Sequence, residues 1–458
     1  MESVLLFVLG VVIIAVGVAL SIALHEVGHL VPAKLFGVKV TQYMIGFGPT
    51  LFSRRRGETE YGVKAIPLGG YIAMIGMYPP KHEGDPVREQ AVGIFQGIGP
   101  QASAPAPESR TSMVDEARAA SAETIGEGEE HRAFYRLPVW KRVIVMAGGP
   151  FMNLVIAAVL FAVLLCGIGV AQSTTTLASV SQCVVPQSEQ STETCAANDP
   201  LAPGAAAGLL PGDTITSIDG TAVSSWSELT PIIQRSAGVP LSVVVDRDGQ
   251  TLTLSITPAE NEVAVTDASG AVVTDASGAT ETQTVGFIGI SPTSALVQQP
   301  ITAVPETLWQ NITSVAHVIL NLPQRLIDVA QAAFGSEERD ANGPISVVGV
   351  GRIAGEIAAS DQLPVVSKVQ TMVGVLASLN VALLVFNLVP LLPMDGGHIA
   401  GALWEGLRRR IAKLFGRRDP GPFDIARLLP LTYVVVIVLG GMSALLIYAD
   451  IVKPITLF

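Results

Sequence analysis

The feature that most constrains this chain is an uncharged apolar run that ends in two histidines and a glutamate. Residues 4–24 carry no charge and are long enough to cross a lipid bilayer as one helix. The following residues read His25-Glu-Val-Gly-His29. On a helix His25 and His29 project from one face, with Glu26 beside them. Such groups are costly at membrane depth unless they bind something or line a wet cavity, so the pattern predicts a zinc site.

The composition favours a polytopic α-helical membrane protein with a soluble insert. The chain has 458 residues, of which 49% are hydrophobic and only 15% charged. That is too apolar for an ordinary soluble protein and too long for one domain. Apolar runs at residues 4–24, 143–172, 369–394 and 428–449 predict four transmembrane helices.

The distribution of basic residues predicts the orientation of these helices. Lysine and arginine crowd residues 34–64, 132–142 and 408–418, whereas residues 173–365 hold few of them. By the positive-inside rule the crowded segments are cytoplasmic, and the long segment and both termini are outside the cytoplasm. The net charge of −11 gives no reason to expect a nucleic acid partner. We expect a cytoplasmic membrane as the location.

Two segments between the spans predict β structure. Residues 43–49 and 61–77 are rich in glycine, aromatic and β-branched residues and predict a membrane-re-entrant hairpin, whose open edge could accept an extended peptide. A cytoplasmic hairpin with no substrate role is the alternative. In the segment expected outside the cytoplasm, the stretch Gly212-Asp-Thr-Ile-Thr-Ser-Ile-Asp-Gly220 resembles the pattern of the PDZ domains found in bacterial proteases. Such domains bind peptide tails. The spacing of residues 301–334 predicts amphipathic helices on the outer membrane surface.

The third apolar run supplies a candidate for a third zinc ligand. It ends in Asn387-Leu-Val-Pro-Leu-Leu-Pro-Met-Asp395, where two prolines break the helix and free backbone groups. An Asp-Gly near a helix end is usually a turn, but a carboxylate at membrane depth needs a cation. Since the first and third spans both run inward, Asp395 is expected to meet His25 and His29. We regard His398 as a supporting residue.

The second span contains Gly148-Gly-Pro-Phe-Met-Asn153. Close packing against another helix is the usual reason for small residues there. A role for Asn153 at the site is the alternative, and we include it among the candidates for positioning substrate. Cys183 and Cys195 both lie in the exterior segment, where a disulfide or two free thiols are equally compatible with the sequence.

Together these motifs resemble the site-2 protease family of intramembrane zinc metalloproteases, especially the bacterial members with one PDZ domain. The resemblance implies that His25, His29 and Asp395 bind Zn²⁺ and that Glu26 is the general base. It also implies that Gly46, Phe47 and Gly48 belong to a hairpin that aligns substrate and that Asn387 helps to hold it. The implied function is hydrolysis of peptide bonds inside single-span proteins. The implied substrate is an anti-sigma factor already trimmed by another protease, cleaved in envelope-stress signalling.

Two other functions remain open on the sequence alone. A metal transporter could also carry histidine and aspartate in its spans, and a non-catalytic adaptor could bind tails through a PDZ domain.

The motifs and apolar runs divide the chain into nine expected segments. From the first residue to the last they are the first helix (1–30), a re-entrant β region (31–79), a disordered cytoplasmic loop (80–133), a juxtamembrane segment and second helix (134–172), a PDZ domain with a repeat-containing loop (173–295), an amphipathic region (296–365), the third helix (366–400), a basic cytoplasmic segment (401–427), and the fourth helix with a tail (428–458).

Overall fold

The computed structural model describes residues 2–79, 113–183, 200–264, 282–335, 339–340 and 343–455. The chain divides into two compact units. One comprises Met1–Ile168 together with Pro300–Phe458, and the other comprises Gly169–Gln299. Each unit has a hydrophobic core of its own, so each is described by itself. The predicted repeat at 265–279 lies outside the described residues.

In the described part of the chain, four helices are long and apolar enough to cross a membrane, as the sequence predicts. They are α1 (Glu2–Leu35), α3 (Val139–Ala162) with the π turn Val163–Ile168, α9 (Val365–Asn387) and α11 (Leu429–Val452). Their exposed surfaces are largely aliphatic, which suits contact with acyl chains rather than water.

Two of the predicted spans are too long at their carboxyl ends. The second helix stops at Ile168, because Gly169 has a φ of +92° and strand β3 (Val170–Val180) begins directly after it. The third stops at Asn387, since Pro390 follows closely and cannot continue the helical hydrogen bonding. Asp395 therefore belongs to a new helix, α10 (Asp395–Leu414), and not to the end of the span.

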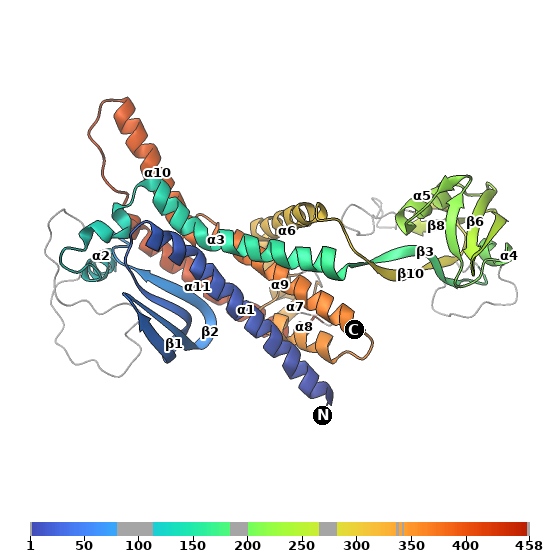
Figure 1. Cartoon of the computed structure of the whole chain (residues 1–458), viewed down its shortest axis with the longest axis horizontal. Helices are drawn as coiled ribbons and strands as arrows, with labels where there is room; N and C mark the ends of the chain where they lie inside the picture. Colours follow the sequence, from blue (N-terminus) through green and yellow to red (C-terminus); the bar gives the residue numbers. More distant parts are fainter. Residues whose placement is uncertain are drawn as a thin grey trace. The chain divides into compact units, whose positions relative to one another are not determined.

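Helices α1, α3 and α9 form the centre of the first unit, and α1 and α3 cross closely (Figure 1). A Cβ added to Gly28 would lie 2.2 Å from the carbonyl oxygen of Gly148, and one added to Gly148 would lie 2.0 Å from that of Gly28. Only glycine permits this approach, and small residues at helix contacts are typical of membrane proteins. Helix α10 packs along α3, and α8 (Val347–Ala359) packs along α1.

The predicted hairpin is present as two long antiparallel strands, β1 (Val40–Arg56) and β2 (Thr59–Met74). Both strands bend, so that the first half of β1 lies between the two halves of β2. Tyr43, for example, pairs with both Ile72 and Tyr61. Positive φ angles at Gly46 (+92°) and Gly48 (+84°) produce the bend in β1. The sheet packs on α1, with Tyr43 donating a hydrogen bond to the carbonyl of Ala23 at 2.7 Å.

The loop expected at 80–133 is ordered in its second half. Residues 80–112 lie outside the described residues, but Met113–Glu123 form helix α2 and residues 130–136 form two short 3-10 turns. Ion pairs hold this part against the sheet, with Lys39 2.6 Å from Glu129 and Arg132 2.8 Å from Glu58. The sequence predicts disorder because this stretch lacks an apolar repeat, whereas these polar contacts stabilise it.

The amphipathic spacing of residues 301–334 corresponds to two helices, α6 (Ala303–Leu320) and α7 (Leu322–Phe334). Helix α6 packs on α9 and α3, and α7 packs on the end of α11. There the carboxylate of Asp450 is buried, pairs with Arg339 and accepts hydrogen bonds from the backbone of Ser346 (2.7 Å) and Gly349 (3.2 Å). This carboxylate therefore joins α11 to the start of α8.

The second unit is built around a mixed α+β core. Its main sheet has the order β10-β3-β4-β6-β7, and helix α5 (Trp226–Arg235) covers it. The remaining strands are β4 (Thr214–Ile218), β5 (Thr221–Ala222), β6 (Leu241–Arg247), β7 (Gln250–Ile256), β8 (Ala259–Ala264), β9 (Thr282–Phe287) and β10 (Ile290–Val297). Asp219 and Gly220 form a tight turn after β4, with φ of +48° and +78°. Cys183 is disulfide-bonded, and Cys195 lies outside the described residues.

Candidate metal centre and its family

Helix α1 places the two predicted histidine ligands together inside the helix bundle. His25 and His29 are one turn apart, and their exposed fractions are only 9% and 5%. Their Nε2 atoms lie 3.2 Å apart, and the ring planes are nearly perpendicular, at 81°. Two basic ring nitrogens that face each other at this distance in an apolar bundle need a shared partner.

Asp395 supplies the acidic group opposite the two imidazoles. Its Oδ2 lies 3.4 Å from Nε2 of His25 and 3.3 Å from Nε2 of His29. Asp395 is the first residue of α10, which begins after the non-helical segment that contains Pro390 and Pro393. Residues more than 360 positions apart in the sequence thus form one cluster of three ligand-type groups.

This cluster fits a tetrahedral zinc ion. Ligand atoms about 2.0–2.2 Å from zinc lie about 3.3–3.6 Å from one another in a tetrahedron, close to the three distances observed. Oδ2 of Asp395 is buried without a hydrogen-bond partner among the described residues, as a metal ligand would be. Gly149 of α3 leaves the necessary room, since a Cβ there would lie 2.2 Å from Nε2 of His29 and 2.7 Å from Nε2 of His25.

The remaining ring nitrogens point away from the cluster towards α3. Nδ1 of His29 lies 2.8 Å from the carbonyl oxygen of Val145, and Nδ1 of His25 lies 3.1 Å from the amide group of Asn153. Contacts of this kind orient an imidazole and determine which nitrogen carries the proton. Asn153 is fully buried.

Glu26 lies beside the cluster and against the hairpin sheet. It is buried, with 8% of its surface exposed, and a Cβ added to Gly70 of β2 would lie 3.0 Å from Cγ of Glu26. The lack of a side chain at Gly70 therefore lets the second half of β2 pass directly beside the carboxylate. A general base next to a strand edge can act on a peptide that pairs with that edge.

Among the described residues, no hydrogen bond or ion pair joins the other candidate residues to His25, His29 or Asp395. Gly46, Phe47 and Gly48 form the bend of β1, where Phe47 stacks on Tyr71 with ring centroids 6.2 Å apart and is 46% exposed. Asn387 is the last residue of α9, half-buried. His398 follows Asp395 by one turn on α10, and its Nδ1 is buried without a partner among the described residues.

Sequence reasoning identified only part of the contribution of α3 to this centre, because it named Asn153 as a candidate but neither Val145 nor Gly149 as a contact of the histidines. Val145, Gly149 and Asn153 are spaced four residues apart, so one stripe of the helix meets both imidazoles. Gly149 and Asn153 stand in the motif that we interpreted mainly as helix packing. The polar Asn153 within an apolar span was the signal used, and the residues one and two turns before it on the same helix face complete the stripe.

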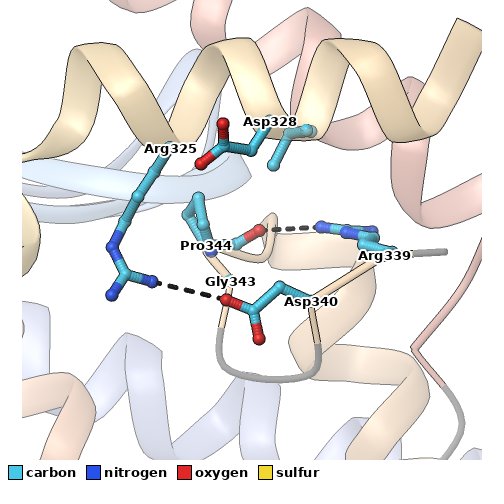
Figure 2. Close-up of a pocket in the computed structure, with 7 residues that line it drawn as sticks. Arg325, Asp328, Arg339, Asp340, Gly343 and Pro344 are labelled. Atoms are coloured by element: carbon cyan, nitrogen blue, oxygen red, sulfur yellow. Dashed lines mark hydrogen bonds and ion pairs between the residues drawn. The ribbon is translucent and has the colours of Figure 1, made fainter. Parts of the chain in front are cut away.

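Another polar cavity in the first unit is lined by arginine and aspartate side chains. It has a volume of about 90 Å³ and lies between α7 and residues 339–340 and 343–344. Figure 2 shows Arg325 facing Asp340, at 3.9 Å, and Arg339 donating to the carbonyl of Pro344, at 2.7 Å. Arg339 also pairs with Asp450, and the lining includes neither histidine nor cysteine.

Comparison with known proteins agrees with this geometry. The model of peptidase family M50 matches residues 13–418. The chain belongs to this family. It is 32% identical over 99% of its length to the zinc metalloprotease Rip1 of Mycobacterium tuberculosis, and 33% identical to Rip1 of Mycolicibacterium smegmatis, both matched in full. The zinc metalloprotease RasP of Shouchella clausii is 26% identical over 84% of this chain and 87% of its own.

Membership of peptidase family M50 makes the chain a zinc metalloprotease of the site-2 protease type. Members of this class are membrane proteins that act on other membrane proteins. The four apolar helices of this chain agree with that. Neither the transporter nor the non-catalytic adaptor considered from the sequence accounts for this membership.

Proposed function

We propose that this protein hydrolyses peptide bonds within the transmembrane segments of single-span proteins, with His25, His29 and Asp395 as zinc ligands and Glu26 as general base. The observation that carries the proposal is the meeting of these three ligand groups beside Glu26 in a bundle of helices apolar enough to span a membrane. When bound, zinc supplies a Lewis acid that lowers the pKa of water and polarises a carbonyl.

The side chains of this chain then move the proton. Glu26 accepts it from the water molecule that attacks the peptide carbonyl and returns it to the leaving amine. The surrounding helices exclude bulk water, which strengthens the interactions of these charged groups. The closeness of Glu26 to Gly70 supports this role, because a peptide paired with that strand would lie beside the carboxylate.

The second half of β2 is the proposed docking edge for substrate. Residues 70–74 pair with β1 on one side, and no further strand pairs with them among the described residues. A helical substrate hides its carbonyls in hydrogen bonds, so it must unwind before cleavage, and strand pairing gives the freed backbone groups new partners. We propose that Gly46, Phe47, Gly48 and Asn387 keep the substrate in register on this edge.

We propose that the second unit is a PDZ domain that binds peptide tails. A groove of about 120 Å³ lies between α5 and the segment 286–290. Leu229 and Ile233 of α5 line it together with Ile288 and Ile290. A groove between a helix and a strand suits an extended chain end. Thr230→Arg would fill the groove, and loss of tail-peptide binding by the full-length protein, with Glu26-dependent cleavage of a tail-less substrate retained, would support this role.

The location and the physiological substrate are also proposed. Crowding of basic residues at 34–64 and 408–418 supports a bacterial cytoplasmic membrane with both termini and the PDZ domain outside the cytoplasm. A single-span anti-sigma factor, trimmed beforehand by another protease, is the proposed substrate, on the basis of the family resemblance.

The deciding experiment is co-expression with candidate single-span proteins. Wild type should produce a fragment cut within the membrane segment, and Glu26→Gln should not, although it should still bind zinc. If Glu26→Gln produced the same fragment at the same rate, the proposed mechanism would be wrong.

A further inference from the structure

The two histidines of the metal centre are oriented by different kinds of group. Nδ1 of His29 lies 2.8 Å from the carbonyl oxygen of Val145. A carbonyl can only accept, so Nδ1 of His29 must carry the proton, and Nε2 keeps its lone pair for a metal. The backbone of α3 thus determines the tautomer of His29. Because the acceptor is a backbone carbonyl, substitution of the Val145 side chain does not remove it.

His25 has no such carbonyl at its Nδ1, which faces the side-chain amide of Asn153 at 3.1 Å. The nitrogen of that amide is drawn towards His25, while its oxygen Oδ1 is buried without a partner. If the amide nitrogen donated to Nδ1, the proton of neutral His25 would sit on Nε2, facing Asp395 and His29, and Nε2 could not bind a metal.

A half-turn of the amide removes this difficulty. The oxygen of Asn153 then accepts a hydrogen bond from Nδ1 of His25, and Nε2 of His25 presents its lone pair to the cluster. Amide orientation is assigned from such networks. We propose that Asn153 is a positioning residue that holds His25 in its zinc-binding tautomer and ring orientation. This inference rests on the zinc site of the proposed function.

The placement of Asn153 on α3 supports this role rather than simple helix packing. Gly149, one turn earlier, contacts both imidazoles, and Val145, another turn earlier, bonds to His29. One stripe of α3 therefore contacts Nδ1 of His29 through Val145 and Nδ1 of His25 through Asn153. An asparagine supplies an acceptor without adding a further carboxylate to those of Glu26 and Asp395 in an apolar bundle, where buried charges are costly.

The chain provides a matched control in Asn380 of α9. Asn380 is also buried, with 1% exposed, and also has an amide oxygen without a partner among the described residues. Its amide nitrogen donates to Ser21 at 3.0 Å and to the carbonyl of Leu376 at 2.8 Å. It therefore joins two spans by a polar contact, as Asn153 does, without touching a histidine ligand.

The test is the zinc affinity of the purified full-length protein, measured by competition with a chelator. Asn153→Leu removes the acceptor at similar volume and should weaken zinc binding about 10- to 100-fold, the usual effect of losing a group that orients a ligand. Asn153→Asp keeps an acceptor and should bind zinc within a few-fold of wild type. Asn380→Leu should leave zinc affinity unchanged. In the cobalt-substituted protein, Asn153→Leu alone should alter the visible absorption bands.

Each other outcome contradicts the inference. Equal losses of zinc affinity in Asn153→Leu and Asn380→Leu would indicate general loosening of the bundle. Unchanged zinc affinity with a raised KM in Asn153→Leu would indicate substrate positioning. If Asn153→Leu fails to fold, a tenfold loss of zinc in folded Asn153→Asp would overturn the proposal. Absence of zinc binding by wild type would instead refute the proposed function itself.

Discussion

Arg142 of α3 and Glu405 of α10 form a buried ion pair, with 2.5 Å between Nη2 and Oε1. Both side chains are almost fully buried, and the second oxygen of Glu405 accepts a hydrogen bond from the backbone of Phe423 at 2.9 Å. Because α10 begins with Asp395, this pair joins the helix that carries the acidic ligand to the helix that contacts both histidines. The ion pair therefore helps to determine where Asp395 lies.

Removing one member of this pair should destabilise the protein. Glu405→Gln leaves the Arg142 guanidinium buried without its countercharge, which typically costs about 3–5 kcal/mol. We expect a lower unfolding temperature in detergent and weaker zinc binding, because α10 loses its attachment to α3. The control is Glu356→Gln, which breaks the more exposed pair of Arg352 and Glu356 on α8 and should cost only about 0.3–0.5 kcal/mol. Equal destabilisation by both variants would contradict this role.

Adding a methyl group at Gly149 should abolish zinc binding. A Cβ there would lie 2.2 Å from Nε2 of His29 and 2.7 Å from Nε2 of His25, so both imidazoles would have to move. We expect Gly149→Ala to be isolated without zinc and to lack protease activity. Gly440→Ala in α11 is the control, since nothing lies within 4 Å of its added Cβ. Measurement of bound zinc by mass spectrometry distinguishes the two, and full zinc occupancy in Gly149→Ala would refute this account.

The proximity of the three proposed ligand groups could be predicted from the sequence because it follows from local periodicity and chain direction. The spacing of His25 and His29 places them on one face of a helix, and two inward-running spans bring Asp395 towards them. The structure places all three groups together. The proline break after Asn387 was also predictable, but the start of a new helix at Asp395 was not, because a break does not reveal how the chain continues.

The contacts that support the ligands could not be predicted in the same way. The stripe of Val145, Gly149 and Asn153 meets the imidazoles only because the α1 and α3 backbones approach closely at Gly28 and Gly148. That register depends on three-dimensional packing, and single-sequence patterns do not specify which residues of two helices meet. Arg142 and Glu405 are 263 positions apart, and nothing local marks either as a partner.

Acid should weaken the second unit through Asp213. The hydrogen bonds that Arg247 donates to Asp213, at 2.6 and 2.8 Å, hold the pKa of this buried carboxyl below its ordinary value. A lowered pKa in the folded state means that the contribution is present above the unfolded pKa of about 3.9 and is lost as the pH falls through the folded value. Asp213→Asn should therefore lower the unfolding temperature of this unit at pH 7. The difference from wild type should shrink below about pH 4, and a constant difference would exclude the ion pair as its cause.

The bend of β1 offers a way to separate substrate positioning from zinc binding. Gly46 has a φ of +92°, and an added Cβ would lie 2.7 Å from the carbonyl oxygen of Ile66, so Gly46→Ala should distort the sheet. Strain of this kind costs about 1–3 kcal/mol, enough to lower cleavage of a transmembrane substrate about tenfold or more. Zinc content should be unchanged, because Gly46 does not contact the ligands. Gly57→Ala is the control, since it has a similar positive φ of +64° in the turn after β1 but no atom within 4 Å of the added Cβ. Loss of zinc in Gly46→Ala, or equal loss of cleavage in Gly57→Ala, would show that the bend does not act through the substrate.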